Sequence, residues 1–317
     1  MRWGGHEVTM INLSKLDWCL FICLLVLGFL GTWVPIFDVD EGAFLEATRE
    51  LLNGGHWAAT TLDGEPRFDK PIFSYWIQSI SLKLFGNLDP WIPIEMAGRL
   101  PSVIAGALWA VVLGRFSAEH TQKPTLGVFV AFALSTSLGI LVISRAATAD
   151  SILNLWLALI FTDIARYIRN PSDSMRLRVF LWVGLGLLTK GPVAAIIPAG
   201  AFSLWVLISN QWPVMVSAIR SSKAWLLLIA ILTPWLVGVY DAQGMEFFEE
   251  FILRHNIERF VGNLHGHGGN LFYYVFVMPL ILLPYSGLLI AILMSARQYW
   301  ADPIDRFALI WIGLVVI

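Results

Sequence analysis

The stretch Trp18–Ile36, WCLFICLLVLGFLGTWVPI, carries no charged side chain. About 20 apolar residues are enough for a helix to cross a hydrocarbon core about 30 Å thick. No small-residue cleavage site precedes the acidic residues that follow, so we interpret the stretch as an uncleaved anchor. Of the 317 residues, 57% are hydrophobic and only 14% are charged, against about 25% charged residues in soluble proteins. This composition excludes a water-soluble globule, a disordered chain and a nucleic-acid-binding protein.

Further apolar runs predict an all-α integral membrane protein, which we treat as a single domain over residues 1–317. The predicted spans after the first are residues 93–114, 125–144, 149–167, 179–189, 193–209, 224–240 and 271–294. A last run, 307–317, has 11 residues and would rise only about 16 Å as a helix. A chain end at that depth would leave carbonyl groups unsatisfied in lipid. We therefore expect a C-terminally truncated part of a longer protein.

The basic residues predict the orientation of the chain. With the N-terminus in the cytoplasm, every inside loop holds at least two Lys or Arg residues, as the positive-inside rule requires. The outside then contains two long segments that do not span, residues 37–92 and 241–270. Apolar stripes at helical spacing in both segments predict helices that lie flat at the interface, one of them opening at Pro71.

Lys190 is the most informative charged residue. It follows a predicted helix, 179–189, that is too short to span, and it precedes Gly191-Pro192. A charge below the membrane surface costs about 2.5–3.5 kcal/mol and usually serves a function. We therefore consider a cavity role for Lys190 beside the alternative of a lysine that reaches back to the interface.

Two further positions suit chemistry on an anionic lipid. Lys70 precedes Pro71, which predicts a helix N-terminus that favours phosphate; the alternative is a surface pair of Asp69 with Lys70. His255 and Arg259 are four residues apart, and the guanidinium suits a lipid phosphate, although a plain polar helix face would have the same spacing.

Carboxylates follow the first span and open the fourth. A helix cap needs only one carboxylate, but three follow the first span: Asp38, Asp40 and Glu41. One of them could therefore act as a general base. Asp150 offers the same choice between cap and base. His265 and His267 are a weak metal signal without a completing ligand set, and we expect neither a metal nor a cofactor.

Six motifs in order resemble one superfamily. They are Asp40-Glu41, the sequence FDKPIFSYW from Phe68, TADS from Thr148, LLTKGP from Leu187, HNIERF from His255, and FYY with LLPY from Phe272. This order resembles the bacterial aminoarabinose transferase and protein O-mannosyltransferase superfamily, which are membrane glycosyltransferases of the GT-C fold. The resemblance covers about Asp38 to Ser286. It implies a polytopic helical bundle with periplasmic interfacial helices in the bacterial inner membrane.

The resemblance also implies roles. Asp40 is similar to the catalytic carboxylate, with Glu41 beside it, and Lys70 and Arg259 are similar to the clamp on the donor phosphate. Residues that would line the same site are Asp69, Asp150, Lys190 and His255. One departure concerns the acceptor: the aminoarabinose transferases usually have Arg-Tyr where this chain has Ala43-Phe44, which weakens the inference of a lipid A acceptor.

The expected reaction moves a sugar from a polyprenyl-phosphate donor to a lipid or polysaccharide acceptor on the periplasmic face. Cations would stabilise the departing phosphate and a carboxylate would deprotonate the acceptor hydroxyl, with inversion at the sugar. A protein acceptor is the alternative within the enzymes. Outside the enzymes, a lipid transporter or flippase and a lipid-binding assembly subunit remain open.

Overall fold

The computed structural model describes residues 14–36, 38–88, 91–251 and 273–316. Within them the chain is almost entirely helical, and the departure from the all-α prediction is one short antiparallel hairpin. The elements in chain order are α1 Lys15–Phe29, α2 Val39–Leu52, β1 Thr60–Leu62, β2 Glu65–Arg67, α3 Phe73–Phe85, α4 Ile94–Thr121, α5 Pro124–Thr136, α6 Leu138–Arg145, α7 Asp150–Arg169, α8 Asp173–Lys190, α9 Val193–Ser209, α10 Trp212–Ile219, α11 Ser222–Phe248, α13 Tyr273–Ile281, α14 Gly287–Tyr299 and α15 Pro303–Val316.

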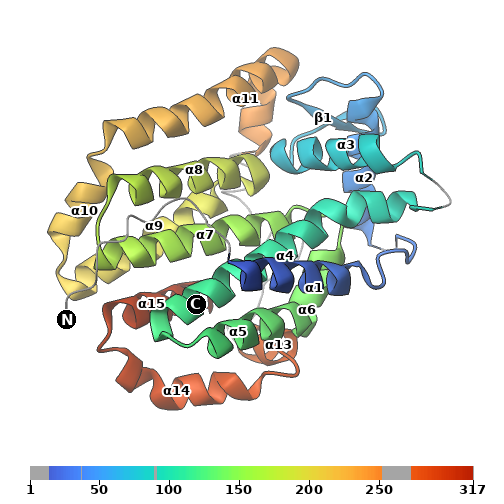
Figure 1. Cartoon of the computed structure of the whole chain (residues 1–317). Coiled ribbons are helices and arrows are strands. Elements are labelled where there is room, and N and C mark those ends of the chain that lie inside the picture. The colour runs from blue at the N-terminus through green and yellow to red at the C-terminus, as the bar shows by residue number, and fades with distance from the viewer. Residues whose placement is uncertain (1–13, 37, 89–90, 252–272, 317) are drawn as a thin grey trace.

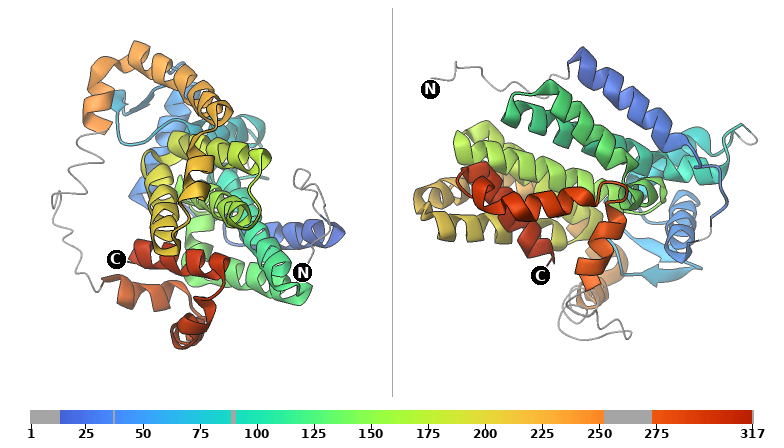
Figure 2. Two further views of the ribbon diagram at one scale, coloured as in Figure 1. Left: turned by 90° about the vertical axis from the view of Figure 1, so that its left-hand side faces the viewer. Right: turned by 90° about the horizontal axis from the view of Figure 1, so that it is seen from below.

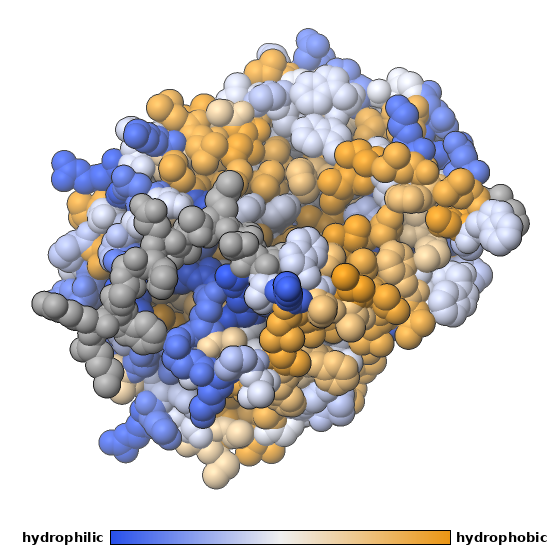
Figure 3. All heavy atoms as spheres, in the orientation of Figure 1, coloured by the Kyte–Doolittle hydropathy of each residue, from blue (hydrophilic) through white to orange (hydrophobic). Residues whose placement is uncertain are grey.

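The long helices run side by side in one bundle, and the hairpin with α2 and α3 covers one end of it (Figures 1 and 2). The connections from α7 to α8 and from α9 to α10 lie at the opposite end. In Figure 3 hydrophobic side chains cover a broad middle region of the visible face, and hydrophilic ones gather toward its left and upper right edges. A polar surface at each end of an apolar belt is the arrangement that a bilayer requires.

Among the described residues, three helices are long and apolar enough to cross a membrane: α4, α7, and α11 with its continuation to Phe251. A fourth span results if α5 and α6 count as one bent element. The chain is therefore a multi-pass membrane protein. The predicted outer end of the seventh span at Tyr240 is not a helix end, because α11 continues to a kink at Gly244, where φ is +65°.

The predicted span 125–144 is divided. The backbone of Ser137 is extended, and α5 and α6 meet there at an angle of 67°. Two hydrogen bonds stabilise the break: the Ser137 hydroxyl donates to the carbonyl of Ala133 at 2.7 Å, and the N–H of Leu138 donates to the carbonyl of Leu283 at 2.9 Å. The apolar pattern contains no trace of this division, because apolar residues continue on both sides of Ser137.

The helix before Lys190 is longer than the sequence predicted. It begins at Asp173 and has 18 residues, because Ser172 caps its N-terminus and accepts a hydrogen bond from the N–H of Met175 at 3.3 Å. The predicted span begins after Arg178, whereas Arg178 lies within α8. Its guanidinium binds the buried carboxylate of Asp163 at 2.8 and 2.9 Å. The predicted short helix before Lys190 was therefore wrong, and helix length gives no reason to place Lys190 below the membrane surface.

Close backbone contact joins α4 to α5. A Cβ atom added at Gly114 would lie 2.6 Å from the carbonyl oxygen of Gly127, and one added at Gly127 would lie 2.5 Å from that of Gly114. Small residues at such crossings let two membrane helices approach closely, which increases their van der Waals contact. This crossing fixes α4, and α4 in turn supports the residues of the candidate site.

Candidate active site

The first turn of α2 positions the carboxylates that follow the first span. Asp38 caps the helix, and its Oδ1 accepts a hydrogen bond from the N–H of Asp40 at 2.7 Å. Asp40 is exposed, and among the described residues its carboxylate has no hydrogen-bond or ion-pair partner. Asp38 therefore serves as the cap, and the Asp40 carboxylate is open to a substrate.

Glu41, the next residue along the helix, is buried. Its two oxygens accept hydrogen bonds from Nε and Nη2 of Arg99 at 2.8 and 2.7 Å, and Oε1 also accepts one from the N–H of Ala147 at 2.7 Å. Arg99 donates further to the carbonyl oxygens of Thr32 and Val34. This pair connects the chain after α1 with α2, α4 and the link into α7. The geometry gives Glu41 an architectural role, and we do not assign it a catalytic one.

Lys70 belongs to a compact charge cluster, which we call the Arg67 cluster: Arg67, Asp69 and Lys70. Nε and Nη2 of Arg67 donate to the two oxygens of Asp69 at 2.6 and 2.9 Å, and Nζ of Lys70 lies 3.3 Å from Oδ2 of Asp69. The predicted helix start at Pro71 was wrong, because α3 begins at Phe73. Pro71 cannot donate a backbone N–H to the chain around it, and Ile72 takes the cap position.

The electrostatics of this cluster reach Asp40. Burial alone would lower the pKa of Arg67, but its hydrogen bonds to Asp69, together with the charges of Tyr75 and Asp69 and, least, that of Asp40, outweigh burial and raise it. Burial alone would raise the pKa of Asp69, and the bonds from Arg67 with the charge of Lys70 reverse this and lower it. Burial raises the pKa of Tyr75, on which the charge of Asp40 also acts. Asp40 and the Arg67 cluster thus share one electrostatic environment.

Asp150 and Lys190 form a second charge pair. Asp150 opens α7, Lys190 ends α8, and their side chains make a direct ion pair. The hydroxyl of Thr148 also donates to Oδ2 of Asp150 at 3.3 Å. The structure therefore brings both predicted residues together, although no local pattern indicates that they are partners.

Aromatic side chains connect the two charge groups. The ring of Phe68 lies 6.3 Å from that of Phe247, which lies 5.3 Å from that of Phe251. Phe251 packs on Gly191, next to Lys190, where an added Cβ would lie 2.5 Å from the ring. The kinked end of α11 thereby packs between the Arg67 cluster and the end of α8.

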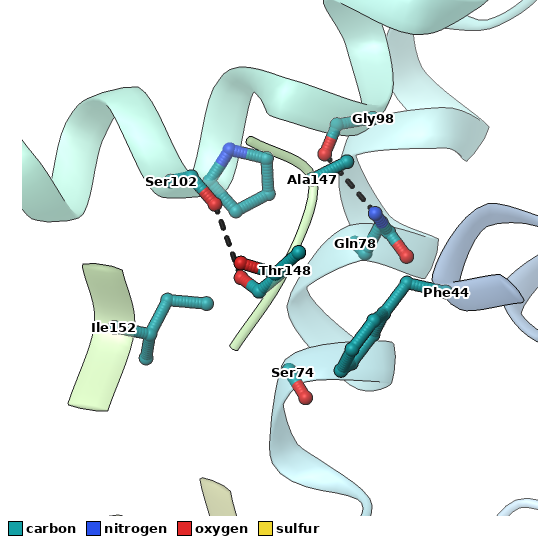
Figure 4. Close-up of a pocket in the computed structure, with 9 residues that line it drawn as sticks. Phe44, Ser74, Gln78, Gly98, Ser102, Ala147, Thr148 and Ile152 are labelled. Atoms are coloured by element: carbon teal, nitrogen blue, oxygen red, sulfur yellow. Dashed lines mark hydrogen bonds between the residues drawn. The ribbon is translucent and has the colours of Figure 1, made fainter. Parts of the chain in front are cut away.

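A small pocket lies between α2, α3, α4 and the link into α7 (Figure 4). Two hydrogen bonds cross its wall: Nε2 of Gln78 donates to the carbonyl oxygen of Gly98 at 3.2 Å, and the hydroxyl of Ser102 donates to the backbone carbonyl oxygen of Thr148 at 3.2 Å. Gln78 also accepts a hydrogen bond from the buried hydroxyl of Thr48. This polar interior ties the helix of Asp40 to the bundle.

Three described residues at the opposite end could in principle hold a metal ion: His120, Asp302 and Asp305. Each already has protein partners. Nε2 of His120 pairs with Asp305 at 2.9 Å, and Asp302 binds Arg169 at 3.2 Å and accepts from the N–H of Ile304 at 2.8 Å. We interpret this group as an ion-pair connection between α4 and α15.

The predicted residues His255 and Arg259 lie outside the described residues, as do His265 and His267. Sequence reasoning did not single out Arg67 or Arg99. Both lie in segments predicted to be outside or at the start of a span. A signal existed for Arg67, which stands within three residues of Lys70, whereas nothing local indicates that Arg99 would meet Glu41.

A sequence model of the dolichyl-phosphate-mannose-protein mannosyltransferase family matches residues 69–238. The chain is similar to undecaprenyl phosphate-alpha-4-amino-4-deoxy-L-arabinose arabinosyl transferases. The protein of Shewanella sediminis (strain HAW-EB3) is 28% identical over 96% of this chain and 54% of its own length. That of Yersinia enterocolitica is 27% identical over 90% of this chain and 50% of its own length. The chain thus spans about half the length of these curated relatives.

The fold is also similar to a solved structure, the crystal structure of ArnT from Cupriavidus metallidurans bound to undecaprenyl phosphate. The TM-score is 0.82 at 20% sequence identity, over 96% of this chain and 55% of the solved one. This likeness confirms the predicted all-α, GT-C-type membrane fold.

Proposed function

Because the chain belongs to the dolichyl-phosphate-mannose-protein mannosyltransferase family, we propose that it forms the catalytic membrane part of a glycosyltransferase. The enzyme moves a sugar from a polyprenyl-phosphate donor to a lipid or polysaccharide acceptor. The arabinosyl transferase relatives, which match nearly the whole chain, carry an undecaprenyl phosphate-linked sugar in their name and so favour this donor class. The family description favours a protein acceptor as the second candidate.

In the proposed reaction the acceptor hydroxyl attacks the anomeric carbon in a single displacement. Asp40 takes the proton of the hydroxyl, the carbon–oxygen bond to the phosphate breaks, and the lipid phosphate leaves as an anion. Lys70 stabilises the charge that develops on this leaving group. A single displacement inverts the anomeric centre, so NMR analysis of the product should show the opposite configuration from the donor, and retention would contradict the mechanism.

One observation carries the proposal. The guanidinium of Arg67 lies 5.5 Å from the centroid of the Phe44 ring, one turn along α2 from the exposed carboxylate of Asp40, and it is bonded through Asp69 to Lys70. A base and a phosphate-binding cation beside one another are what the displacement needs. We place this site on the periplasmic face of the bacterial inner membrane, with the N-terminus in the cytoplasm, because basic residues gather in the opposite loops.

The proposal is tested by sugar transfer from a polyprenyl-phosphate-linked sugar, measured with the protein in lipid nanodiscs. Asp40→Asn and Lys70→Ala should each reduce turnover strongly, while Lys83→Ala, at an exposed lysine on the last turn of α3, should keep it. Donor binding without turnover in the unmodified protein would favour a lipid-binding subunit. Movement of the donor between leaflets without sugar transfer would favour a flippase.

A further inference from the structure

The Arg67 cluster contains two cations and one anion, and their contacts are unequal. Arg67 holds both oxygens of Asp69 at 2.6 and 2.9 Å, while Lys70 makes a single longer contact of 3.3 Å. The Arg67 side chain is 10% exposed and that of Lys70 is 20% exposed. Asp69 is therefore mainly the partner of Arg67, since bidentate carboxylate–guanidinium pairs are the stronger and more fixed kind.

The consequence concerns the charge that Lys70 can offer. With Arg67 in place, the cluster carries a net charge of +1. The positive charge of Lys70 is the more exposed of its two cations. Without Arg67, the carboxylate of Asp69 would neutralise Lys70 and leave no net charge for an anion. A phosphate bound to Lys70 would then also lie close to the negative carboxylate of Asp69, which would repel it.

Arg67 is held too deeply to perform the task of Lys70 itself. Its guanidinium lies 5.5 Å from the centroid of the Phe44 ring. Its remaining nitrogen, Nη1, is buried and has no hydrogen-bond partner within the described part of the chain. The side chain is thus fixed by Asp69 and by the ring beneath it, and it influences an anion at Lys70 through Asp69.

We propose that Arg67 is a positioning residue that neutralises Asp69 and so keeps the charge of Lys70 available for a lipid-linked phosphate. This inference rests on the proposed function, because it names the residue that makes the phosphate site electropositive. A purely structural role of Arg67 would give a different result in a double variant. Removing the charge of Asp69 should compensate for losing Arg67, which a packing defect would not allow.

The test measures the affinity of the protein in nanodiscs for two probes, a polyprenyl monophosphate and the uncharged polyprenol. Arg67→Gln should weaken phosphate-lipid binding about tenfold or more and leave polyprenol binding unchanged. The double variant R67Q/D69N should return within about threefold of the unmodified protein, and D69N alone should bind at least as tightly. Arg67→Lys, which keeps the charge and loses the fork, should retain most of the affinity.

Three results would overturn the inference. R67Q could bind the phosphate lipid as well as the unmodified protein does, R67Q/D69N could stay as weak as R67Q, or R67Q could lose affinity for both probes equally. Thermal unfolding of each variant identifies misfolded protein, and R67K provides the test if R67Q does not fold. If the unmodified protein does not prefer the phosphate lipid over polyprenol, the proposed function itself fails, which separates that outcome from the other three.

Discussion

Asp40 and Glu41 are adjacent in sequence and different in environment. Successive helix residues point about 100° apart, so one carboxylate is exposed at the site and the other is buried against Arg99. The sequence marks both as acids after the first span, and no local pattern tells which one turns inward. Only the position of Arg99, 58 residues further along the chain, decides it.

Asp40→Asn should reduce sugar transfer about 10²- to 10⁴-fold, the usual contribution of a general base. The amide has the same shape but cannot accept the proton of the acceptor. Because the carboxylate has no partner among the described residues, the thermal unfolding temperature should not change. A variant that transfers sugar at the unmodified rate would remove Asp40 from the mechanism.

Glu41→Ala should destabilise the fold instead. It leaves the guanidinium of Arg99 buried without its counter-ion, which costs about 3–5 kcal/mol. The measurement is denaturant unfolding in detergent. Glu46→Ala on the same helix is the matched control, because Glu46 pairs with Arg49 at the surface, where such a pair contributes little to stability. Equal losses in the two variants would contradict the architectural role of Glu41.

Asp69 should make stability depend on acid pH. Its pKa is lowered in the folded protein, so the folded state binds its proton less readily than the unfolded chain does. The resulting stabilisation is present above the ordinary pKa of an aspartate and is lost as the pH falls through the lowered folded value. Unfolding followed from neutral to acid pH should show a smaller loss for Asp69→Asn than for the unmodified protein. An equal loss of stability with falling pH in the two proteins would contradict this role of Asp69.

At the scale of the elements, hydropathy indicated the long helices but not α10, the division of the predicted span 271–294 into α13 and α14, or the helix ends. It failed at Arg178, because a buried aspartate neutralises that charge inside α8. It failed at Ser137, because the partner that satisfies the broken backbone, Leu283, comes from a distant segment. Helix existence follows from local apolar pattern, whereas bends and ends depend on partners that the pattern does not contain.

The crossing of α4 and α5 gives a prediction at this scale. Gly114→Ala should lower the free energy of unfolding by about 1–3 kcal/mol, because the new methyl group would overlap the carbonyl of Gly127 on the neighbouring helix. Gly313→Ala is the control, since a Cβ atom there meets nothing within 4 Å. Thermal unfolding in detergent compares the two. If Gly114→Ala is as stable as Gly313→Ala, the helices do not cross as closely as described.

At the scale of the whole molecule, the candidate site is assembled from segments that lie far apart in sequence. Asp40 comes from α2, the Arg67 cluster from the end of β2 and the turn that follows it, and the Asp150–Lys190 pair from two further helices. The sequence predicted most of these residues because each stands beside the end of an apolar run. It could not predict the pairings, which depend on how α7, α8 and the end of α11 pack together.

The orientation of this assembly in the membrane yields the last prediction. If basic loops are cytoplasmic, the hairpin faces the periplasm and the link from α9 to α10 faces the cytoplasm. In a background with Cys19 and Cys23 replaced by serine, single cysteines are placed at Glu65 and Gln211, which are both exposed at opposite ends. A membrane-impermeant thiol reagent should label Glu65→Cys in intact cells and Gln211→Cys only after permeabilisation. The reverse pattern would turn the molecule over and place Asp40 and Lys70 on the cytoplasmic side, where the proposed periplasmic transfer could not occur.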